Sequence, residues 1–198
     1  MSGCKIILGS RSPRRRQLLE EAGWTVQVTE PHIDDGQLEP PADHAPGWTM
    51  ALAWMKARSV SMTLDAQMAL PIVTADTVCV HDGHVIGQPT DAGHARSMVI
   101  SMRDATHDVL TGLCVLCQGQ RHLAVDRSTV HVGTVSDTQV DQYIQSNAWQ
   151  GKAGAYNLSD RVEAGWPIRW EGDPTTIMGL PMNKLMPLLR DCGVECPS

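Results

Sequence analysis

The chain has 198 residues, of which 42% are hydrophobic, and its formal net charge is −6. This length suits one globular domain, so we interpret residues 1–198 as a single domain. The acidic balance disfavours a nucleic-acid partner, because broad nucleic-acid binders carry excess positive charge. No apolar run approaches the roughly 20 residues of a membrane span, and residues 5–8 are too short for the apolar part of a secretory leader. We therefore expect a cytoplasmic protein with no membrane partner.

The first predicted elements are a strand and a helix. Residues 5–8 form a short apolar run that is typical of a strand. Ser12 is a good helix N-cap, and Pro13 suits the first helical position because the N–H that proline lacks has no intrahelical partner there. Leu19 continues an apolar face, and Gly23 is placed to end the helix.

The rest of the chain mixes strands with helices. Further strands are predicted at 24–29, at 71–80 with an interruption at the polar triplet Thr74-Ala75-Asp76, and at two places in 107–132 joined at Gln118-Gly119-Gln120. Helices are predicted at 48–62, at 90–102 with Thr90-Asp91 as its cap, at 136–144 and at 182–190. Segments 30–47 and 151–172 are interpreted as loops, the second with short strands, and Asp82-Gly83 as a hairpin turn. Adjacent hairpin strands among helices predict an α/β fold with a mixed sheet.

The turn before the first helix gathers groups that bind phosphate. Ser10 and Ser12 offer hydroxyls, Arg14 and Arg15 offer guanidinium groups, and the free N–H groups of the first helical turn point the same way. A solvated arginine face is the alternative. Cations at this end oppose the helix dipole, however, which favours a bound anion. We predict a phosphate-binding corner.

Asp76 is the acid that the pattern singles out. It follows the apolar pair Ile72-Val73 at or near the predicted end of a strand, where α/β proteins place ligand chemistry. The alternative is a capped turn made by Asp76 and Thr77. Asp34 and Asp35, in the proline-rich loop, are further carboxylates of interest. Such acids hold Mg²⁺ or Mn²⁺ or activate water in phosphoryl chemistry, so we expect one of these metals as cofactor.

Two lysines and two cysteines are the remaining candidates for a functional role. Lys56 lies on a predicted helix and Lys152 in a glycine-rich segment, where each would add positive charge beside phosphates. Cys114 and Cys117 have CxxC spacing but lie in a predicted strand. Their side chains should then point to opposite faces, which argues against a metal or redox pair.

Several ordered motifs over almost the whole chain resemble the Maf nucleotide pyrophosphatases. The matching segments are Ser10-Arg11-Ser12-Pro13-Arg14-Arg15, Ile33-Asp34-Asp35, Lys56-Ala57, Ala75-Asp76-Thr77, Gly87-Gln88-Pro89, His107 to Gly112, Lys152 to Tyr156 and Met178-Gly179-Leu180-Pro181. The resemblance implies an α/β fold around a deep cleft, like that of the inosine triphosphatases, and often a homodimer. It also implies hydrolysis of a nucleoside triphosphate to monophosphate and pyrophosphate.

The resemblance also implies residue roles. Asp76 matches the general base of the family and, with Asp35, would help to hold the metal. Arg14, Thr77 and Ser159 match positions linked to substrate choice. Arginine and threonine at the first two are the pattern of the dTTP/UTP type, whereas the third is usually glutamine there. We therefore expect a dTTP/UTP-type enzyme with broadened specificity.

Two departures leave alternatives open. Gln88 replaces a lysine often found in the cleft, which gives weight to a nucleotide-binding regulator with little turnover, such as a septum-formation inhibitor. The segment Gly172 to Thr176 looks more like the branch that acts on 7-methyl-GTP. Measuring pyrophosphate release from a panel of triphosphates distinguishes these hypotheses.

Overall fold

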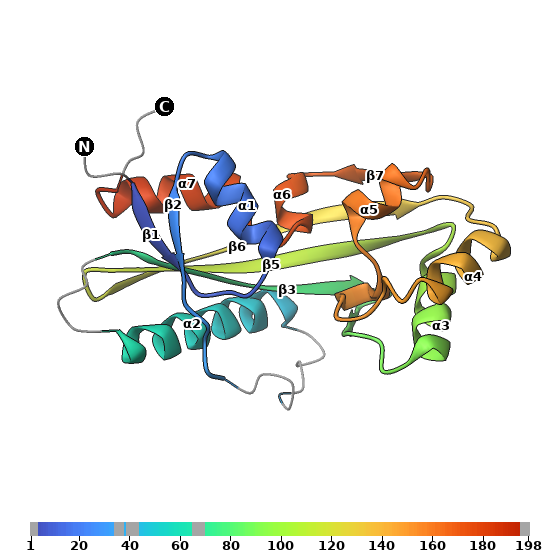
Figure 1. The fold of residues 1–198 in the computed structure, drawn as a ribbon, viewed down its shortest axis with the longest axis horizontal. Coiled ribbons are helices and arrows are strands. Elements are labelled where there is room, and N and C mark those ends of the chain that lie inside the picture. The colour runs from blue at the N-terminus through green and yellow to red at the C-terminus, as the bar shows by residue number, and fades with distance from the viewer. Residues whose placement is uncertain (1–3, 34–37, 39–43, 65–69, 195–198) are drawn as a thin grey trace.

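A seven-stranded mixed sheet runs the length of the molecule (Figure 1). The structure is a computed structural model that describes residues 4–33, 38, 44–64 and 70–194. Its strands are β1 (Lys5–Leu8), β2 (Thr25–Val28), β3 (Ile72–His81), β4 (His84–Ile86), β5 (Ala105–Cys117), β6 (Gln120–Val132) and β7 (Ile168–Glu171). Their order is β2-β1-β3-β5-β6-β7, with β4 on β3, and only β1 pairs in parallel, with β2 and β3. The predicted α/β fold with a mixed sheet is confirmed.

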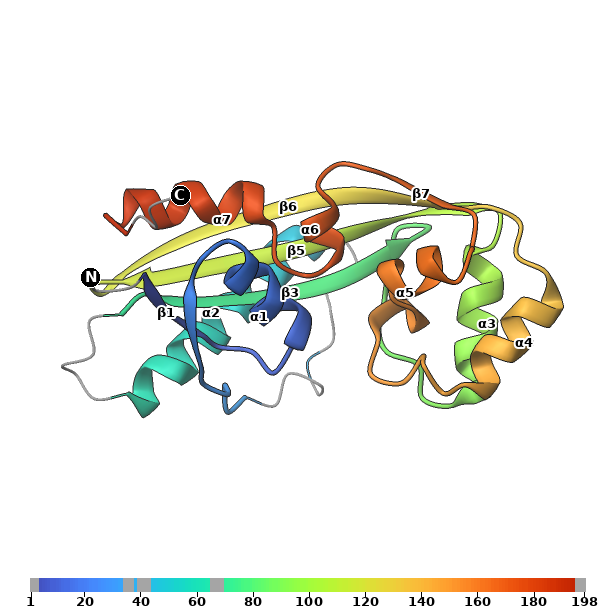
Figure 2. The same ribbon diagram turned by 45° about the horizontal axis from the view of Figure 1, so that its top comes forward.

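Helices cover both faces of the sheet. They are α1 (Pro13–Glu21), α2 (Ala45–Thr63), α3 (Ala92–Met102), α4 (Asp137–Gln145), α5 (Leu158–Glu163), α6 (Pro174–Ile177) and α7 (Met182–Asp191). In Figures 1 and 2, α2 lies on one face while α1 and α7 lie on the other. Buried Cys114 packs with the α2 residues and buried Cys117 with those of α7, so the two cysteines face opposite ways, as predicted.

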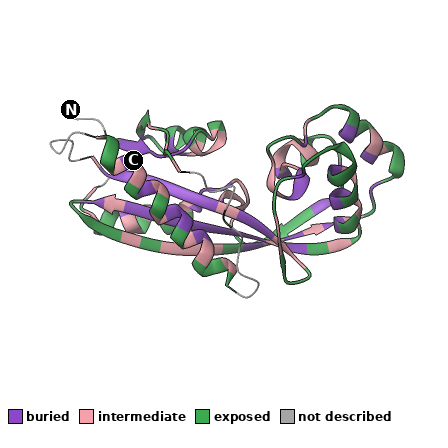
Figure 3. Cartoon of the chain, turned by 90° about the horizontal axis from the view of Figure 1, so that it is seen from below, coloured by how far each residue is buried: buried purple, intermediate pink, exposed green. Residues whose placement is uncertain are grey.

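The molecule has two lobes joined by its longest strands (Figure 3). The first lobe holds β1, β2, α1, α2 and α7 around two apolar cores, one on each sheet face. The second lobe holds α3, α4, α5 and β7 around a separate core that includes Tyr143 and Trp166. Because β5 and β6 have 13 residues each, they pass through both lobes and connect them without a linker.

A gap opens along one edge of β3 between the lobes. β1 pairs with β3 only at Ile72 and Val73, and β4 pairs with it only from Cys79 onward. Between these points, no described strand pairs with the edge of β3 that faces away from β5. Ligands of α/β proteins bind where neighbouring strands diverge in this way.

Three local expectations need correction. Asp76 does not end a strand, because β3 continues unbroken from Ile72 to His81, held over its whole middle by β5. What ends near Asp76 is the pairing with β1. Segment 151–172 holds, besides β7, a short 3₁₀ turn at Ala153–Ala155 and the helix α5. The second helix begins at Ala45, three residues before the predicted start.

Candidate active site

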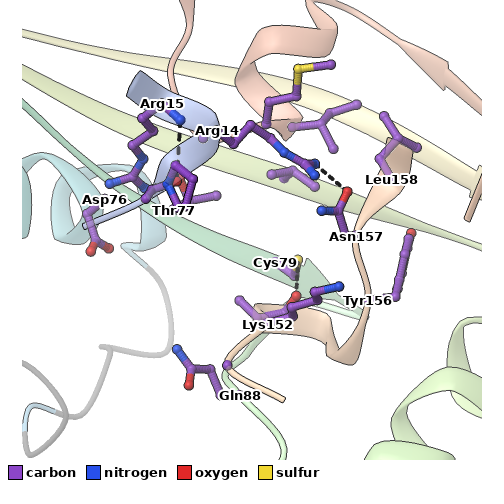
Figure 4. Close-up of a pocket in the computed structure, with 18 of the residues that line it drawn as sticks. Arg14, Arg15, Asp76, Thr77, Cys79, Gln88, Lys152, Tyr156, Asn157 and Leu158 are labelled. Atoms are coloured by element: carbon purple, nitrogen blue, oxygen red, sulfur yellow. Dashed lines mark hydrogen bonds between the residues drawn. The ribbon is translucent and has the colours of Figure 1, made fainter. Parts of the chain in front are cut away.

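A cleft of about 750 Å³ lies at the gap between the lobes (Figure 4). Its walls come from the start of α1, the middle of β3, the segment from Gln150 to Leu158, and Ile177 to Gly179. A smaller hollow of about 260 Å³ shares Arg15 and Lys56 with it. Most of the predicted site residues therefore meet at one place.

The N-terminus of α1 opens onto this cleft. The Ser12 hydroxyl accepts a hydrogen bond from the backbone N–H of Arg15, which is the predicted N-cap. The Ser10 hydroxyl accepts from the N–H of Ser12 at 3.2 Å. These bonds fix the turn between β1 and α1, so the first turn of the helix presents its positive end to the cleft.

In the gap, the Arg15 side chain hydrogen-bonds to residues of β3. Its Nη1 donates to the Ala75 carbonyl at 2.6 Å and its Nη2 to the Thr77 hydroxyl at 3.1 Å. Burial lowers the pKa of Arg15, and the charge of Asp76 opposes that shift. Gly179 makes room here, since a Cβ at this position would lie 3.1 Å from Arg15 Nε. The guanidinium is thus a fixed positive charge beside Asp76.

Asp76 forms an ion pair with Lys56 across one face of the sheet. Lys56 Nζ, from α2, lies 2.6 Å from Asp76 Oδ1, and the two side chains are only 16% and 11% exposed. Asp76 Oδ2 makes no hydrogen bond to any residue in the described ranges. This carboxylate therefore keeps one oxygen for a ligand or a water molecule.

Thr77 begins a chain of hydroxyl bonds on the opposite face. Thr111 donates to the Thr176 carbonyl at 2.8 Å, so its single proton is used there. The 2.9 Å contact between Thr77 and Thr111 must then be donated by Thr77. The single Thr77 proton is therefore used on Thr111, and Arg15 donates to the same Thr77 oxygen. The Thr77 hydroxyl can thus accept a hydrogen bond from a ligand but cannot donate one.

A second group of charges crosses from one lobe to the other. Arg14 Nη1, from α1, donates to Asn157 Oδ1 at the N-cap of α5, and Figure 4 shows this bond reaching over the cleft. Arg14 Nη2 also lies 3.4 Å from Asp160 Oδ1. Lys152 Nζ lies 3.0 Å from Asp160 Oδ2. Arg14 and Lys152 are therefore linked by one carboxylate.

The far end of the cleft is more apolar and holds a buried histidine. Val109, Leu158 and Ile177 line it together with His107 and Tyr156. His107 is 3% exposed, and its Nε2 lies 2.9 Å from the Tyr156 hydroxyl. Burial lowers the pKa of His107 to about 4, so its imidazole is neutral at physiological pH. His107 therefore adds no positive charge to this wall of the cleft.

The donors in the cleft fit a hard divalent cation held partly by its ligand. Asp76 offers a carboxylate oxygen, and no group of three or more His, Cys, Asp or Glu side chains in the described ranges could hold a metal alone. Mg²⁺ in phosphoryl-transfer sites commonly uses one or two carboxylates together with substrate phosphates. Asp34 and Asp35 lie outside the described residues, so the role predicted for Asp35 stays a prediction.

The structure brings together nearly all of the predicted side chains. Ser12, Arg14, Arg15, Lys56, Asp76, Thr77, Gln88 and Lys152 line the larger cleft, and Ser10 the smaller one. Ser159 does not line either hollow. It lies in the first turn of α5 and donates its backbone N–H to Asn157. Asn157 and Asp160 were missed, because only the tertiary fold carries their side chains to Arg14.

Known proteins resemble this chain over most of its length. A family model described as Maf-like protein matches residues 5–192. The chain belongs to the Maf-like protein family. Among this chain's relatives, a dTTP/UTP pyrophosphatase of Salinibacter ruber is 34% identical over 189 residues, covering 94% of this chain and 90% of that protein.

Other relatives of this Maf-like protein carry the same name. A dTTP/UTP pyrophosphatase of Chlorobaculum parvum is 34% identical over 188 residues, covering 94% of this chain and 93% of that protein. Another, of Methylobacillus flagellatus, is 32% identical over 194 residues, covering 98% and 95%. Of the helices that the structure describes, none has the length and apolar character needed to cross a membrane.

Proposed function

We propose that this Maf-like protein hydrolyses a nucleoside triphosphate to the nucleoside monophosphate and pyrophosphate. The observation that carries the proposal is the placement of the Lys56–Asp76 pair beside Arg15 and the start of α1, at one gap in the sheet. One part of this site offers positive charge for phosphates, and the other offers a carboxylate for water. The shared name of the relatives supports the same reaction.

In the proposed reaction Asp76 is the general base. Lys56 holds Oδ1 at 2.6 Å, which leaves Oδ2 to take a proton from an attacking water molecule. The water oxygen bonds to the α-phosphorus while the bond from that phosphorus to the bridging oxygen breaks. The electron pair of that bond leaves with pyrophosphate.

Cations from both lobes would bind the triphosphate. Arg15 and the first turn of α1 lie beside Asp76, while Arg14 and Lys152 lie farther along the cleft. Ser10 and Ser12 place hydroxyls at the same turn. Such fixed donors contribute mainly by orienting the substrate and by stabilising the negative charge of the transition state.

We also propose dependence on Mg²⁺ or Mn²⁺. Asp76 would hold the cation together with phosphate oxygens of the substrate, and Asp35 is the second proposed ligand. When bound, the metal supplies charge neutralisation at the phosphate oxygens. Hard oxygen donors such as these suit Mg²⁺ and Mn²⁺ better than softer metals.

The hydrogen bonding of Thr77 supports a preference for dTTP and UTP. Its proton is donated to Thr111, so Thr77 can accept but not donate toward a ligand. Thymine and uracil carry an N–H at ring position 3, whereas cytosine carries an acceptor there. A lone acceptor in the site therefore discriminates against cytosine, because the mismatch leaves two acceptors facing each other.

A triphosphate panel tests this function. The kcat/KM values for dTTP, UTP, CTP and 7-methyl-GTP are measured from pyrophosphate release with Mg²⁺ and with Mn²⁺. We expect dTTP and UTP to be the best substrates and CTP to be poor. If 7-methyl-GTP is best, the base assignment is wrong. Binding of every triphosphate without release of pyrophosphate would instead indicate a regulator.

Oligomeric state and location extend the proposal. The homodimer that the resemblance implies could use the outer strands of the sheet, since β2 and β7, at the two ends of the strand order, each pair on one side only within the described part of the chain. Sedimentation velocity measures this state directly. A cytoplasmic location agrees with a nucleotide substrate and is tested by cell fractionation.

A further inference from the structure

One carboxylate in the second lobe occupies the two cations at the far side of the cleft. Asp160, in the first turn of α5, lies 3.0 Å from Lys152 Nζ and 3.4 Å from Arg14 Nη2. Both cations line the cleft, as Figure 4 shows, whereas Asp160 itself does not. Asp160 thus has access to the ligand site only through its partners.

The ion pairs that Asp160 makes with Arg14 and Lys152 are partly exposed to solvent, so a ligand can displace them. The side chains of Arg14, Lys152 and Asp160 are 28%, 25% and 40% exposed, so water and salt screen their attraction. The Lys56–Asp76 pair is shorter and far less exposed. An incoming polyphosphate can therefore replace Asp160 on Arg14 and Lys152 more readily than it can part Lys56 from Asp76.

Asp160 carries its charge at neutral pH. Partial burial acts to raise the pKa of this carboxyl, but the hydrogen bond and charge of Lys152, followed by those of Arg14, outweigh burial and lower the pKa. The net charge that the three side chains present to a ligand is consequently one less positive than the two cations alone would give.

Arg14 does not depend on Asp160 for its place. Its Nη1 donates to Asn157 Oδ1, and Asn157 is itself fixed by accepting the backbone N–H of Ser159 at 3.0 Å. Loss of the Asp160 carboxylate would therefore change the charge of the site more than the position of Arg14.

We propose that Asp160 is an internal competitor for the polyphosphate of the ligand: it neutralises Arg14 and Lys152 in the empty cleft and must be displaced when a triphosphate binds. The inference rests on the proposed function for the identity of the ligand. It assigns Asp160 the task of limiting phosphate affinity, which also favours release of the pyrophosphate product.

The test compares binding by Asp160→Asn, Asp160→Glu and the parent, measured by calorimetry with Mg²⁺. The probes are inorganic tripolyphosphate and a dUTP analogue with a non-hydrolysable α,β-imido linkage. Asp160→Asn should bind both about three- to tenfold more tightly, since a competing charge is gone. Asp160→Glu, which keeps the charge, should stay within about twofold of the parent. High salt should shrink the gain.

Asp141→Asn is the matched control. Asp141 pairs with Arg96 at 2.8 Å and is 49% exposed, but neither residue lines the cleft. Asp141→Asn removes the same charge from the protein as Asp160→Asn does, but it does so away from the cleft. Its affinity for both probes should therefore equal that of the parent. Melting temperatures of all variants verify folding.

The outcomes separate this inference from the proposed function. Unchanged binding by Asp160→Asn overturns the inference, because Asp160 would then have no effect on the ligand. Weaker binding also overturns it, because Asp160 would then hold Arg14 and Lys152 in place for the ligand. Failure of the parent to bind either probe overturns it as well. Tighter tripolyphosphate binding by Asp160→Asn, together with no turnover of any triphosphate, upholds the inference and overturns the proposed function.

Discussion

At the scale of single residues, the proposed reaction depends on the ion pair of Lys56 and Asp76. The pair joins α2 to β3 at 2.6 Å beside the unpaired edge of β3. Two features make Asp76 suitable as a base: one oxygen is held by Lys56, and the other faces the cleft without a described partner.

Asp76→Asn should lower kcat by about 10²- to 10⁴-fold, the range typical of a lost general base. The amide keeps the size of the carboxylate and can still accept from Lys56, so the fold and nucleotide binding should survive. Pyrophosphate release and calorimetric affinity for the imido analogue of dUTP measure the two effects. Turnover near the parent rate would remove Asp76 from the chemistry.

His107 makes stability depend on pH. Its pKa is lowered from 6.5 to about 4 by burial, so the unfolded chain binds a proton between these values that the folded chain does not. The stability that comes from burying a neutral His107 is present in full above pH 6.5 and is lost as pH falls toward 4. The separation corresponds to about 3 kcal/mol.

His107→Gln should therefore flatten the loss of stability in acid while keeping a side chain that can bond Tyr156. Urea unfolding at pH 7 and pH 4.5 gives the free energies for the variant, the parent and an exposed control, His84→Gln. We expect the parent and the control to lose about 2 kcal/mol more than the variant. An equal loss in all three would contradict the burial of a neutral imidazole.

At the scale of elements, the site depends on how closely α2 crosses the sheet. Gly112 in β5 lies under α2, and a Cβ there would come within 2.4 Å of the Met50 nitrogen and 2.2 Å of the Thr49 carbonyl carbon. Backbone atoms cannot move aside as a side chain can. This contact fixes the height of α2 above the sheet and hence the reach of Lys56 to Asp76.

Gly112→Ala should destabilise the fold by about 2 kcal/mol or more, because overpacking against backbone forces α2 away from the sheet. The same change at Gly47, an open position in α2, should be neutral or stabilising by up to about 1 kcal/mol. Chemical denaturation of both variants measures the contrast. Similar effects from the two substitutions would argue against the close crossing.

At the scale of the whole molecule, long strands tie both walls of the cleft to one frame. β5 and β6 pass through both lobes, so the cations of α1 and those before α5 keep a set separation. The cleft lies between the apolar cores of the two lobes. The metal that we propose for the cleft is therefore not needed to hold the lobes together.

Chelation should therefore abolish turnover without lowering the melting temperature. Among the described residues that line the cleft, Asp76 is the only carboxylate, and a single proposed ligand adds little to folding. Pyrophosphate release and a thermal melt are recorded with excess EDTA and again after Mg²⁺ or Mn²⁺ is restored. Full activity in EDTA would refute metal dependence, while a large drop in melting temperature would indicate a structural metal.

Local chemistry was enough to predict most elements. Ser12 caps α1, Asp91 caps α3 and Gly119 lies in the turn between β5 and β6, as expected, because caps and turns depend on a few neighbouring residues. The helix α5 was missed because it has six residues and its support is tertiary: Arg161 stacks over Tyr143 at 4.2 Å. Such contacts leave no periodic signal in a short segment.

By itself, the sequence determined the mixed α/β class, the capped start of α1 and the choice of Arg14, Arg15 and Asp76, which line one cleft, as candidate site residues. These follow from capping, from the pattern of apolar residues and from the ordered family motifs. Only the tertiary structure decided that Asp76 lies mid-strand at a gap, that Lys56 holds it, and that Asp160 links Arg14 to Lys152. The physical reason is that these contacts join side chains 8 to 146 positions apart, and what brings them together is the divergence of β1 from β3 and the burial of separate cores.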